Sequence, residues 1–443
     1  MQTVHVIGGG LAGCECACQL ADRGVNVKLY EMRPVTSSPA HHTEHLAELV
    51  CSNSFKSLRE DSAAGMLKRE LASMGSVLVE CAKRASVPAG GALAVDRNVF
   101  SKLVEEQIAK RENIEVIRKE VTDIPKGNVV IAAGPLCSQG LASKVIERTS
   151  GEAMSFFDAA APIVDASTLN YDILFSQSRY EGSDEGDYLN APFDKEEYEA
   201  FITELTGATR TVLKDFETKD LFQACQPAEE VARKGIDAIR FGAMKPVGLT
   251  DPRTGRRPWA AVQLRAENAE KTAYNLVGFQ TNLTFGEQKR VFRMIPGLEN
   301  AEFFRYGVMH RNTFVDAPHV LDRTFKIPGT TVRLAGQITG TEGYTEAIAS
   351  GLLAALNTMC DLNGTDPVQL PETSVFGALV AYATNPDTVD YQPMHVNFGI
   401  IPPLEDGKRR SKRDRYAAYS ERGRLALEAY LSSRPDLFAS PDA

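Results

Sequence analysis

A glycine-rich turn near the N-terminus limits the possible folds of this 443-residue chain more than any other feature does. The apolar run 4–7 predicts a buried strand, and it is followed directly by Gly8, Gly9, Gly10, Leu11, Ala12 and Gly13. Gly8, Gly10 and Gly13 have the G-x-G-x-x-G spacing. In this pattern the first glycine permits a tight turn, the second lets a pyrophosphate approach the backbone, and the third lets helix pack on strand. We expect a helix from this turn to about residue 23.

An acidic residue completes the pattern. The predicted second strand, 25–30, leads into Glu31. This is the position, about 20 residues beyond the glycines, where a carboxylate bonds the ribose of an adenine dinucleotide. The pyrophosphate would then lie at a helix N-terminus, where free N–H groups favour anions. The alternative is a glycine-rich turn in some other α/β protein, but the strand, the helix and Glu31 together favour a dinucleotide-binding βαβ unit.

A second turn far along the chain favours FAD over NAD. It lies between a predicted strand, 331–335, and a predicted helix that extends through residue 359, and it contains Gly336, Gln337, Gly340 and Gly343. Two-domain flavoproteins commonly use such a turn to hold the ribitol and to direct a helix N-terminus at the flavin ring. Because many of them carry Asp where this chain has Gln337, we expect a hydrogen bond to the ribitol without a second charge. A plain strand-to-helix loop is the alternative.

The pattern changes in the middle of the chain. A polar run, 182–190, precedes amphipathic stretches at 196–205 and 211–216, and strand-like pieces follow them before the α/β pattern resumes. A chain of this length exceeds the usual size of one domain. We therefore predict an α/β fold in which a Rossmann-like FAD-binding domain, 1–186 and 306–443, holds an inserted α+β domain, 187–305.

Composition and charge limit the cellular location and the partners that we expect for this chain. No apolar run approaches the roughly 18 residues that a membrane span needs, and no signal peptide precedes the first strand, so we expect no membrane association. Scattered cysteines without a disulfide framework favour the reducing cytoplasm. The formal net charge of −9 argues against indiscriminate nucleic-acid binding, yet 407–424 contains eight Lys and Arg residues and could form a local basic patch. The oligomeric state is not indicated.

Two cysteines differ from the other six. Cys51 lies where apolar residues give way to polar ones, among hydroxyl side chains that suit a reactive thiol. Cys225 precedes a helix predicted to begin near Pro227, and a helix N-terminus stabilises a thiolate, although Glu229 and Glu230 oppose that effect. Either residue could instead be a buried cysteine without a chemical role.

The remaining cysteines and the clustered histidines have simpler interpretations. We expect small core side chains at Cys14, Cys16 and Cys18, whose spacing on one helix cannot bring three ligands together, and also at Cys81 and Cys137. The histidines at 41, 42 and 45 could form a metal site or a loop beside the flavin. No Cys or Asp completes a ligand set there, so we expect no metal.

Longer stretches resemble one known family. The sequence 47–54 (AELVCSNS) is similar to a characteristic stretch of the folate- and FAD-dependent tRNA (uracil-5-)-methyltransferases, the TrmFO family. The similarity covers nearly the whole chain. It continues through 244–249 (MKPVGL), 251–258 (DPRTGRRP), 278–281 (GFQT), 286–290 (GEQKR), 305–313 (RYGVMHRNT) and 336–347.

This resemblance implies an FAD domain of the GidA or glutathione-reductase type and an activity on tRNA. The reaction would be methylation of the T-loop uridine at tRNA position 54. The carbon would come from 5,10-methylenetetrahydrofolate as co-substrate, and the reducing equivalents from NADH or NADPH. GidA proteins are similar in the flavin domain but lack the set of stretches given above.

The resemblance also implies roles for particular residues. The family's two functional cysteines fall on Cys51 and Cys225, and its aromatic residue beside the isoalloxazine falls on Tyr344. We expect Cys225 to add to uracil C6 and Cys51 to assist, with the reverse assignment open. His310, Arg311 and Asn312 resemble folate- or flavin-contacting residues. Independently of the resemblance, the basic run 408–424, with Lys412 and Arg413, is a candidate contact for tRNA phosphates, and Lys56, Arg253, Arg256 and Arg257 are further candidates.

Other functions remain open at this point. A GidA-like, FAD-dependent modifier of the tRNA wobble uridine and a flavin NAD(P)H dehydrogenase are the enzymatic alternatives. A flavin-stabilised RNA-binding protein without catalytic activity is the third. Only the first-named family explains both cysteines and the long similar stretches.

Overall fold

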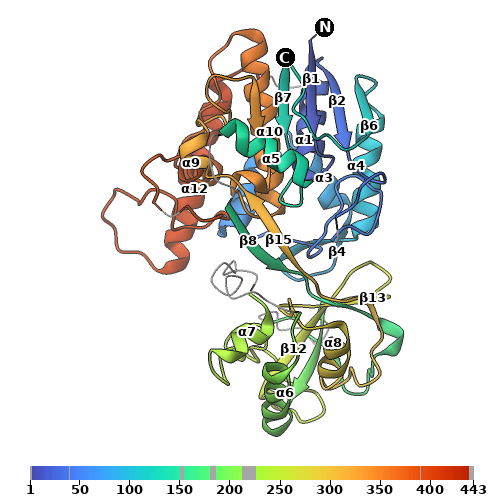
Figure 1. Ribbon diagram of the computed structural model, residues 1–443. Coiled ribbons are helices and arrows are strands. Elements are labelled where there is room, and N and C mark those ends of the chain that lie inside the picture. The colour runs from blue at the N-terminus through green and yellow to red at the C-terminus, as the bar shows by residue number, and fades with distance from the viewer. Residues whose placement is uncertain are drawn as a thin grey trace.

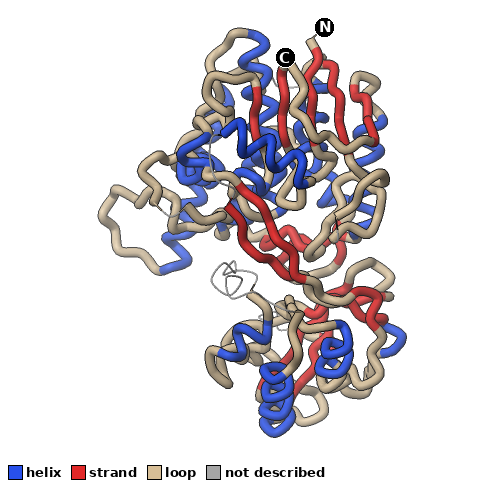
Figure 2. The backbone as a smooth tube through the Cα atoms, viewed as in Figure 1, coloured by secondary structure: helices blue, strands red, loops and turns tan. Residues whose placement is uncertain are grey.

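The computed structural model describes residues 2–38, 40–149, 154–179, 186–211, 226–389 and 391–438, and these form two lobes (Figure 1). Of residues 154–158, 310 and 311 only the backbone is described. The larger lobe holds both ends of the described chain, and the smaller lobe is built from its middle part (Figure 1). Two long strands cross from one lobe to the other (Figure 2).

A five-stranded parallel sheet forms the centre of the larger lobe. Its order is β16(Val332–Leu334), β7(Asn128–Ile131), β1(Thr3–Ile7), β2(Asn26–Glu31) and β6(Ile114–Arg118). β1 therefore has β2 on one side and β7 on the other, so the strand order reverses at β1. In open parallel sheets ligands bind at such a reversal, outside the carboxyl ends of the strands. This arrangement confirms the predicted α/β, Rossmann-like fold.

Helices enclose this sheet and its neighbouring segments. They are α1(Leu11–Asp22), α2(Ala63–Ser73), α3(Val77–Arg84), α4(Arg97–Ala109), α5(Gln139–Thr149), α9(Ala317–Val320), α10(Tyr344–Asn363), α11(Val375–Ala383) and α12(Lys412–Ser433), with the short 3₁₀ turn η3(Gln337–Thr339). Among the described residues, no helix combines the length and the apolar character that crossing a bilayer requires.

Close contact between α1 and α10 brings the two glycine-rich turns together. Cys14, Cys16 and Cys18 are fully buried on α1, as expected for small core side chains. A Cβ atom at Gly351 would lie 2.1 Å from the carbonyl oxygen of Ala12, which only a glycine avoids. The second turn therefore lies against the first although more than 300 residues separate them in sequence.

The smaller lobe has its own sheet and its own core. Its six strands lie in the order β10(Phe175–Ser176), β11(Tyr188–Phe193), β12(Ala260–Ala266), β13(Ala273–Leu276), β9(Ile163–Asp165) and β14(Phe303–Arg305). The pairings are antiparallel. Around them lie α6(Lys195–Gly207), α7(Ala228–Arg233), α8(Phe285–Phe292) and η1(Ala166–Thr168). Four aromatic rings form a continuous row of contacts in this core: Phe193 with Phe201, Phe201 with Phe279, and Phe279 with Phe292.

Two smaller sheets complete the molecule. β8(Met154–Ala159) and β15(Met309–Phe314) pair antiparallel over six residues and form the ribbon between the lobes (Figure 2). β3(Ser54–Ser57), β5(Ala92–Val95) and β4(Ser86–Val87) form a three-stranded sheet in the larger lobe. β3 follows the segment that contains Cys51, and this sheet therefore fixes one end of that segment.

The middle of the chain departs from the sequence prediction in detail. β11 begins at Tyr188, inside the polar run 182–190, because its alternate residues Leu189, Ala191 and Phe193 join the second core. Of the helix predicted at 211–216, only residue 211 belongs to the described residues. The boundaries 187 and 305 of the inserted domain stay a prediction. The second core contains residues from Val164 to Phe303, which favours a start near Ile163.

Candidate active site

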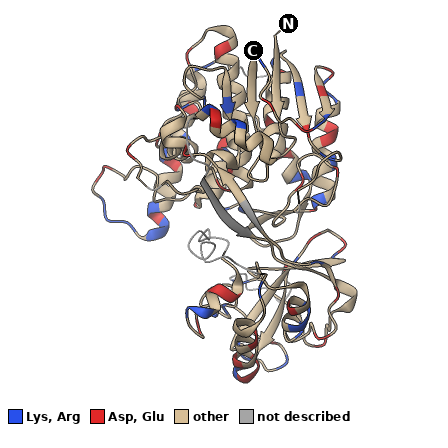
Figure 3. Cartoon of the chain, in the orientation of Figure 1, with Lys and Arg blue, Asp and Glu red and all other residues tan. Residues whose placement is uncertain are grey.

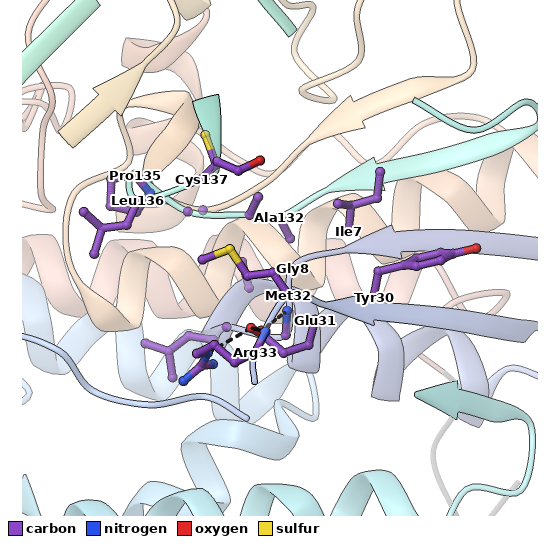
Figure 4. Close-up of a pocket in the computed structure, with 18 of the residues that line it drawn as sticks. Ile7, Gly8, Tyr30, Glu31, Met32, Arg33, Ala132, Pro135, Leu136 and Cys137 are labelled. Carbon is purple, nitrogen blue, oxygen red and sulfur yellow. Dashed lines mark hydrogen bonds and ion pairs between the residues drawn. The ribbon is translucent and has the colours of Figure 1, made fainter. Parts of the chain in front are cut away.

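A cavity opens at the carboxyl ends of β1, β2 and β7, between the two glycine-rich turns (Figure 4). Four segments line it: the first turn, the end of β2, the segment that follows β7, and the start of α10 with its preceding turn. The lining residues used below are Gly8, Gly9, Gly10, Leu11, Ala12, Glu31, Arg33, His41, Glu48, Val50, Pro135, Cys137, Gly336, Gln337 and Tyr344. The cavity is therefore assembled from the parts that the sequence predicted for a dinucleotide.

The glycines of the first turn have different tasks. A Cβ atom at Gly13 would lie 1.8 Å from the carbonyl oxygen of Gly8, so Gly13 permits the contact between helix and strand and does not line the cavity. Gly8 has a φ of +111°, and a Cβ there would lie 2.4 Å from the carbonyl oxygen of Ala132. A Cβ at Gly10 would meet no atom within 4 Å, because this position faces the cavity.

The residues of the second glycine-rich turn also fall into two groups, those that line the cavity and those that shape the backbone. Gly336 and Gln337 line the cavity, whereas Gly340 and Gly343 do not. Gly340 leaves room for the hydroxyl of Tyr391, which would lie 2.3 Å from a Cβ at this position. Gly343 precedes the first turn of α10, where a Cβ would lie 2.3 Å from a carboxylate oxygen of Glu346. These two glycines shape the turn that presents the N-terminus of α10.

A buried charge network surrounds Glu31. One carboxylate oxygen of Glu31 accepts a hydrogen bond from the Gly9 N–H (3.0 Å), and the other accepts from the guanidinium of Arg33 (2.8 Å). Arg33 is 1% exposed and also donates to Glu48 (2.7 Å). Burial would raise the pKa of Glu31, but the hydrogen bonds and the positive charge of Arg33 hold this pKa below its ordinary value. Glu31 is therefore ionised at neutral pH, with one oxygen already fixed on the glycine turn.

The neighbouring histidines do not converge on one point. The ring of His41 contacts the hydroxyl of Ser38 (2.7 Å), and the ring of His45 contacts the carboxylate of Glu105 (2.9 Å). Within the described ranges no cluster of three His, Cys, Asp or Glu side chains is placed to hold a metal ion. Among these histidines, His41 lines the cavity.

We predict that His41 makes the protein acid-sensitive above the range in which carboxylates titrate. Burial and the nearby charge of Arg33 lower the pKa of His41 to about 4. Between pH ~6.5 and ~4 the unfolded chain therefore binds a proton that the native chain does not bind, so stability falls as the pH falls, by up to about 3 kcal/mol. His41→Gln should remove most of this loss in urea unfolding measured across that window. A variant with the wild-type pH dependence would contradict the prediction.

Tyr344 connects the cavity to the segment that carries Cys51. Its side chain is buried and lines the cavity. Its hydroxyl oxygen accepts hydrogen bonds from the backbone N–H groups of Cys51 (2.9 Å) and Ser52 (3.1 Å). Burial raises the pKa of Tyr344, so the hydroxyl stays protonated. The cysteine segment is thus attached to the first residue of α10.

Two guanidinium groups hold the same segment from the other side. Arg97 donates to the carbonyl oxygens of Leu49 and Cys51, and it pairs with Glu267 of the smaller lobe (2.6 Å). Arg305 donates to the carbonyl oxygen of Val50. Cys51 is half-buried, and its Sγ lies 3.8 Å from the carbonyl oxygen of Ala159. Val50 lines the cavity and Cys51 does not, so the thiol lies beside the cavity among cationic groups.

Cys225 lies outside the described residues, but the helix after it is described. α7 begins at Ala228 with Pro227 before it, as predicted. Glu229 is fully buried and accepts from Thr281 (3.0 Å) and from the Asn282 N–H (2.7 Å), and burial raises its pKa. Glu230 pairs with Arg210 and Arg233. The two carboxylates expected to oppose a thiolate are therefore occupied in structural contacts.

The residues expected to contact folate lie on the ribbon between the lobes. His310, Arg311 and Asn312 are all in β15, paired with β8. The Asn312 side chain is 1% exposed, and neither its oxygen nor its nitrogen has a hydrogen-bond partner in the described part of the chain. A buried amide without partners costs about 1–3 kcal/mol per polar atom, and such groups in native proteins call for an explanation.

Lys412 and Arg413 are not brought to the cavity. They begin α12, behind the N-cap Ser411, and both are exposed at the end of that helix (Figure 3). The residues around them on α12 and in the preceding loop form a basic surface on the side of the larger lobe (Figure 3). Its position is compatible with a contact to an extended substrate, not with a contact to the dinucleotide.

Some residues of the site were not predicted. Cys137 was expected to be a core side chain, and it does pack, partly buried, against the large core; it also lines the cavity, because β7 lies next to β1 and the chain leaves β7 at the cavity edge. The turn at 133–135 after the predicted strand 129–132 was the available signal for this. Arg33, Arg97 and Arg305 had no assigned role, because their partners are distant in sequence or follow an irregular loop.

This geometry defines an α/β dinucleotide-binding protein. The family model described as glucose inhibited division protein A (GIDA) matches residues 3–366. Two solved structures of Aquifex aeolicus GidA have TM-scores of 0.69 and 0.68, at 16% and 17% identity. They cover 99% and 98% of this chain and 74% and 77% of their own chains. At this identity the likeness shows the fold alone.

Closer relatives define the particular family. Proteins named methylenetetrahydrofolate--tRNA-(uracil-5-)-methyltransferase TrmFO are 51% identical over 432 residues in Geobacter sulfurreducens and 50% identical over 435 residues in Acetivibrio thermocellus. Both alignments cover 97% of this chain, and they cover 99% and 98% of the relatives. The chain belongs to the TrmFO family, within the wider GidA group.

Proposed function

We propose that this protein methylates C5 of the T-loop uridine at position 54 of tRNA. The carbon comes from 5,10-methylenetetrahydrofolate, and a hydride comes from NADH or NADPH by way of FAD. The proposal rests above all on one observation: a reactive-cysteine segment is held against the wall of a dinucleotide cavity in a chain half identical, over its whole length, to enzymes named for this reaction. We also propose that the enzyme works in the cytoplasm, which the scattered cysteines without a disulfide framework favour.

The residues of the cavity fit FAD. Gly10 leaves open space where a pyrophosphate would approach the N-terminus of α1, and Glu31 presents a carboxylate for the adenosine ribose. Gly336, Gln337 and the N-terminus of α10 lie at the far end, where the ribitol and the ring would be held. When bound, FAD would supply the redox chemistry that a folate methylene group needs to become a methyl group.

The chain itself supplies activation of the uracil. Uracil C5 is a poor nucleophile, and addition of a thiolate to C6 moves electron density to C5. C5 can then form a bond to the one-carbon unit as the bond from that carbon to its carrier breaks, and a base takes the C5 proton. After a hydride has reduced the exocyclic methylene to a methyl group, the thiolate leaves C6 as the C5–C6 double bond re-forms. A nucleophilic cysteine is therefore required, and nothing else in the proposed reaction replaces it.

We assign the addition at C6 to Cys225 and an assisting role to Cys51. The backbone of Cys51 is held by Tyr344 and Arg97, so Cys51 is fixed beside the cofactor wall and suits an auxiliary thiol there. Cys225 precedes α7 of the smaller lobe in sequence, so the two thiols belong to segments that lie far apart in the chain. We further assign the unpartnered amide of Asn312, with His310 and Arg311, to contacts with folate or flavin.

Lys412 and Arg413 are proposed as tRNA phosphate contacts. In the described residues neither side chain has a carboxylate within ion-pairing distance, whereas Arg410 pairs with Asp406, and Arg424 with Glu421 and Glu428. Lys412 lies 5.6 Å from the centroid of the Tyr416 ring, a contact that leaves its charge unneutralised. Cations without a carboxylate partner can neutralise phosphates, and each such contact contributes a salt-dependent term to binding.

We predict that Lys412→Glu with Arg413→Glu weakens tRNA binding about tenfold or more at 50 mM salt. The effect should shrink toward 200 mM salt, because two phosphate contacts and their released counterions are lost. Fluorescence anisotropy with unmodified tRNA at several salt concentrations measures both the affinity and its dependence on salt. Arg424→Glu, on the same helix, is the matched control and should leave the affinity nearly unchanged. An unaltered salt slope in the double variant would remove this surface from the proposal.

One assay distinguishes the proposed function from its alternatives. Purified protein is incubated with unmodified tRNA, labelled 5,10-methylenetetrahydrofolate, and NADH or NADPH. Label in 5-methyluridine of the T-loop is the expected result. Label in the anticodon loop would instead indicate a GidA-like activity, and reductant oxidation without tRNA labelling would indicate a flavin dehydrogenase. Protein that contains FAD but incorporates no label would contradict the proposal.

A further inference from the structure

One exposed aromatic side chain of the smaller lobe takes no part in its core. Phe241 is 75% exposed, more than any other phenylalanine in the described part of the chain. The turn that carries it is nevertheless firmly placed. Ile239 and Met244, on either side, are buried at 1% and 0% exposure, and the Met244 N–H donates to the Ile239 carbonyl (3.0 Å). The ring is therefore held outward by an anchored turn.

Arg240 fixes the surroundings of this ring. Its guanidinium lies 3.9 Å from the centroid of the Trp259 ring, and its Nε donates to the Trp259 carbonyl oxygen (2.8 Å). The same guanidinium lies 5.9 Å from the Phe241 ring and 3.6 Å from Asp237. The contact with Trp259 joins the Phe241 turn to the segment before β12. A planar cation held between two rings is a preorganised element of recognition.

The adjoining segment is basic in an otherwise acidic chain. Residues 226–258 contain seven Lys and Arg against four Asp and Glu, whereas the whole chain has a net charge of −9. The acids are largely engaged: Glu229 is buried, Glu230 pairs with two arginines, and Asp251 pairs with Arg253. Arg256 and Arg257 are exposed, and no described carboxylate pairs with them. They lie just before Trp259, on which Arg240 packs.

We infer that Phe241, Arg240, Arg256 and Arg257, the Phe241 surface, bind RNA, with the Phe241 ring stacked on an unpaired base and the arginines on flanking phosphates. An exposed ring beside cations is the combination that binds single-stranded bases, because stacking tolerates any base and the cations follow the backbone. The segment 226–258 exposes three large apolar side chains, Ile236 (53%), Phe241 (75%) and Val247 (39%), and of these only Phe241 is aromatic. Seven Lys and Arg residues of the same segment accompany them, which favours a polyanion whose bases can stack on the Phe241 ring over an apolar protein partner. The inference rests on the proposed function, and it names a second tRNA contact, separate from the one at Lys412.

The test uses the FAD-loaded full-length enzyme with unmodified tRNA as the probe. Phe241→Ala should raise the tRNA Kd about 5- to 20-fold, as expected for loss of one base stack, and Phe241→Trp should restore binding. The turnover number at saturating tRNA should stay unchanged, since the ring contacts no part of the cavity. Phe304→Ala is the matched control: this phenylalanine is 63% exposed on β14 of the same lobe, and its removal should leave the Kd unchanged.

The outcomes separate this inference from the proposed function. Wild-type enzyme that methylates tRNA, with a Kd for Phe241→Ala within twofold of wild type, would overturn the inference alone. Equal losses in Phe241→Ala and Phe304→Ala would overturn it as well, because the effect would not belong to this surface. Wild-type protein that binds no tRNA would overturn both.

Discussion

Replacing Cys225 by alanine is expected to reduce methyl transfer by about 10³-fold or more while the bound flavin keeps its absorbance. The reason is that C5 of uracil becomes reactive only after a thiolate adds to C6, and the alanine side chain provides no nucleophile. Incorporation of labelled carbon into tRNA measures the reaction, and the visible spectrum measures the flavin. Cys225 precedes α7, and Glu229 of α7 is anchored by hydrogen bonds from Thr281 and Asn282, so we expect the fold to be retained.

Cys51→Ala is the matched variant, and it distinguishes the two thiols. If Cys225 adds to C6, a 5-fluorouracil-containing tRNA should form a covalent complex with the Cys51→Ala protein and none with the Cys225→Ala protein. The opposite pattern would exchange the two roles. Full activity in both variants would exclude covalent activation by either cysteine. The core cysteine Cys16, fully buried on α1, provides a thiol that should not react in either case.

Gly10→Val is expected to abolish FAD binding without unfolding the protein. The backbone at Gly10 has φ −79° and ψ −167°, which valine adopts, and the Cβ position faces open space. The added side chain would fill the place where the pyrophosphate must approach the backbone. The cofactor-free variant should therefore unfold within about 1 kcal/mol of the cofactor-free wild type, allowing for a poorer N-cap residue.

The cofactor-loaded proteins should differ much more. Only the wild type gains the stabilisation that a tightly bound ligand gives to the native state, so its thermal midpoint should rise with added FAD and that of Gly10→Val should not. Gly91→Val is the control, because Gly91 also faces open space but lies away from the cavity. FAD retained by Gly10→Val would show that the cofactor does not cross the first glycine turn.

The parts of the site that the sequence predicts are those determined by local backbone geometry. The roles of Gly8 and Gly13 follow from spacing alone, since a strand, a turn and a helix in succession leave no room for a Cβ at either position. Glu31 follows because the end of β2 must lie beside the end of β1. The β1–α1–β2 part of the parallel sheet was predictable for the same reason, because these two strands and their crossover helix are consecutive in sequence.

The remaining parts depend on contacts between distant segments. Arg97 forms an ion pair with Glu267, and the side-chain oxygen of Asn53 accepts a hydrogen bond from Arg265. The partners lie far apart in sequence, so no local sequence pattern predicts these contacts. Tyr344 was expected beside the flavin from the family resemblance, but its hydrogen bonds to the Cys51 segment required coordinates. Cys137 packs against the core as expected, but its second place, in the cavity wall, could not be predicted, because a thiol after a strand has the same local sequence in either setting.

The ribbon of β8 and β15 has a consequence for how such a protein can change over evolution. The chain enters and leaves the smaller lobe through two directly paired strands, so its crossing points are about 5 Å apart. A module joined in this way can be lengthened, replaced or removed without altering the register of the parallel sheet. A shortened chain needs only a tight turn to close the ribbon. The ribbon is therefore a position at which a different recognition domain can be joined to the same cofactor-binding domain.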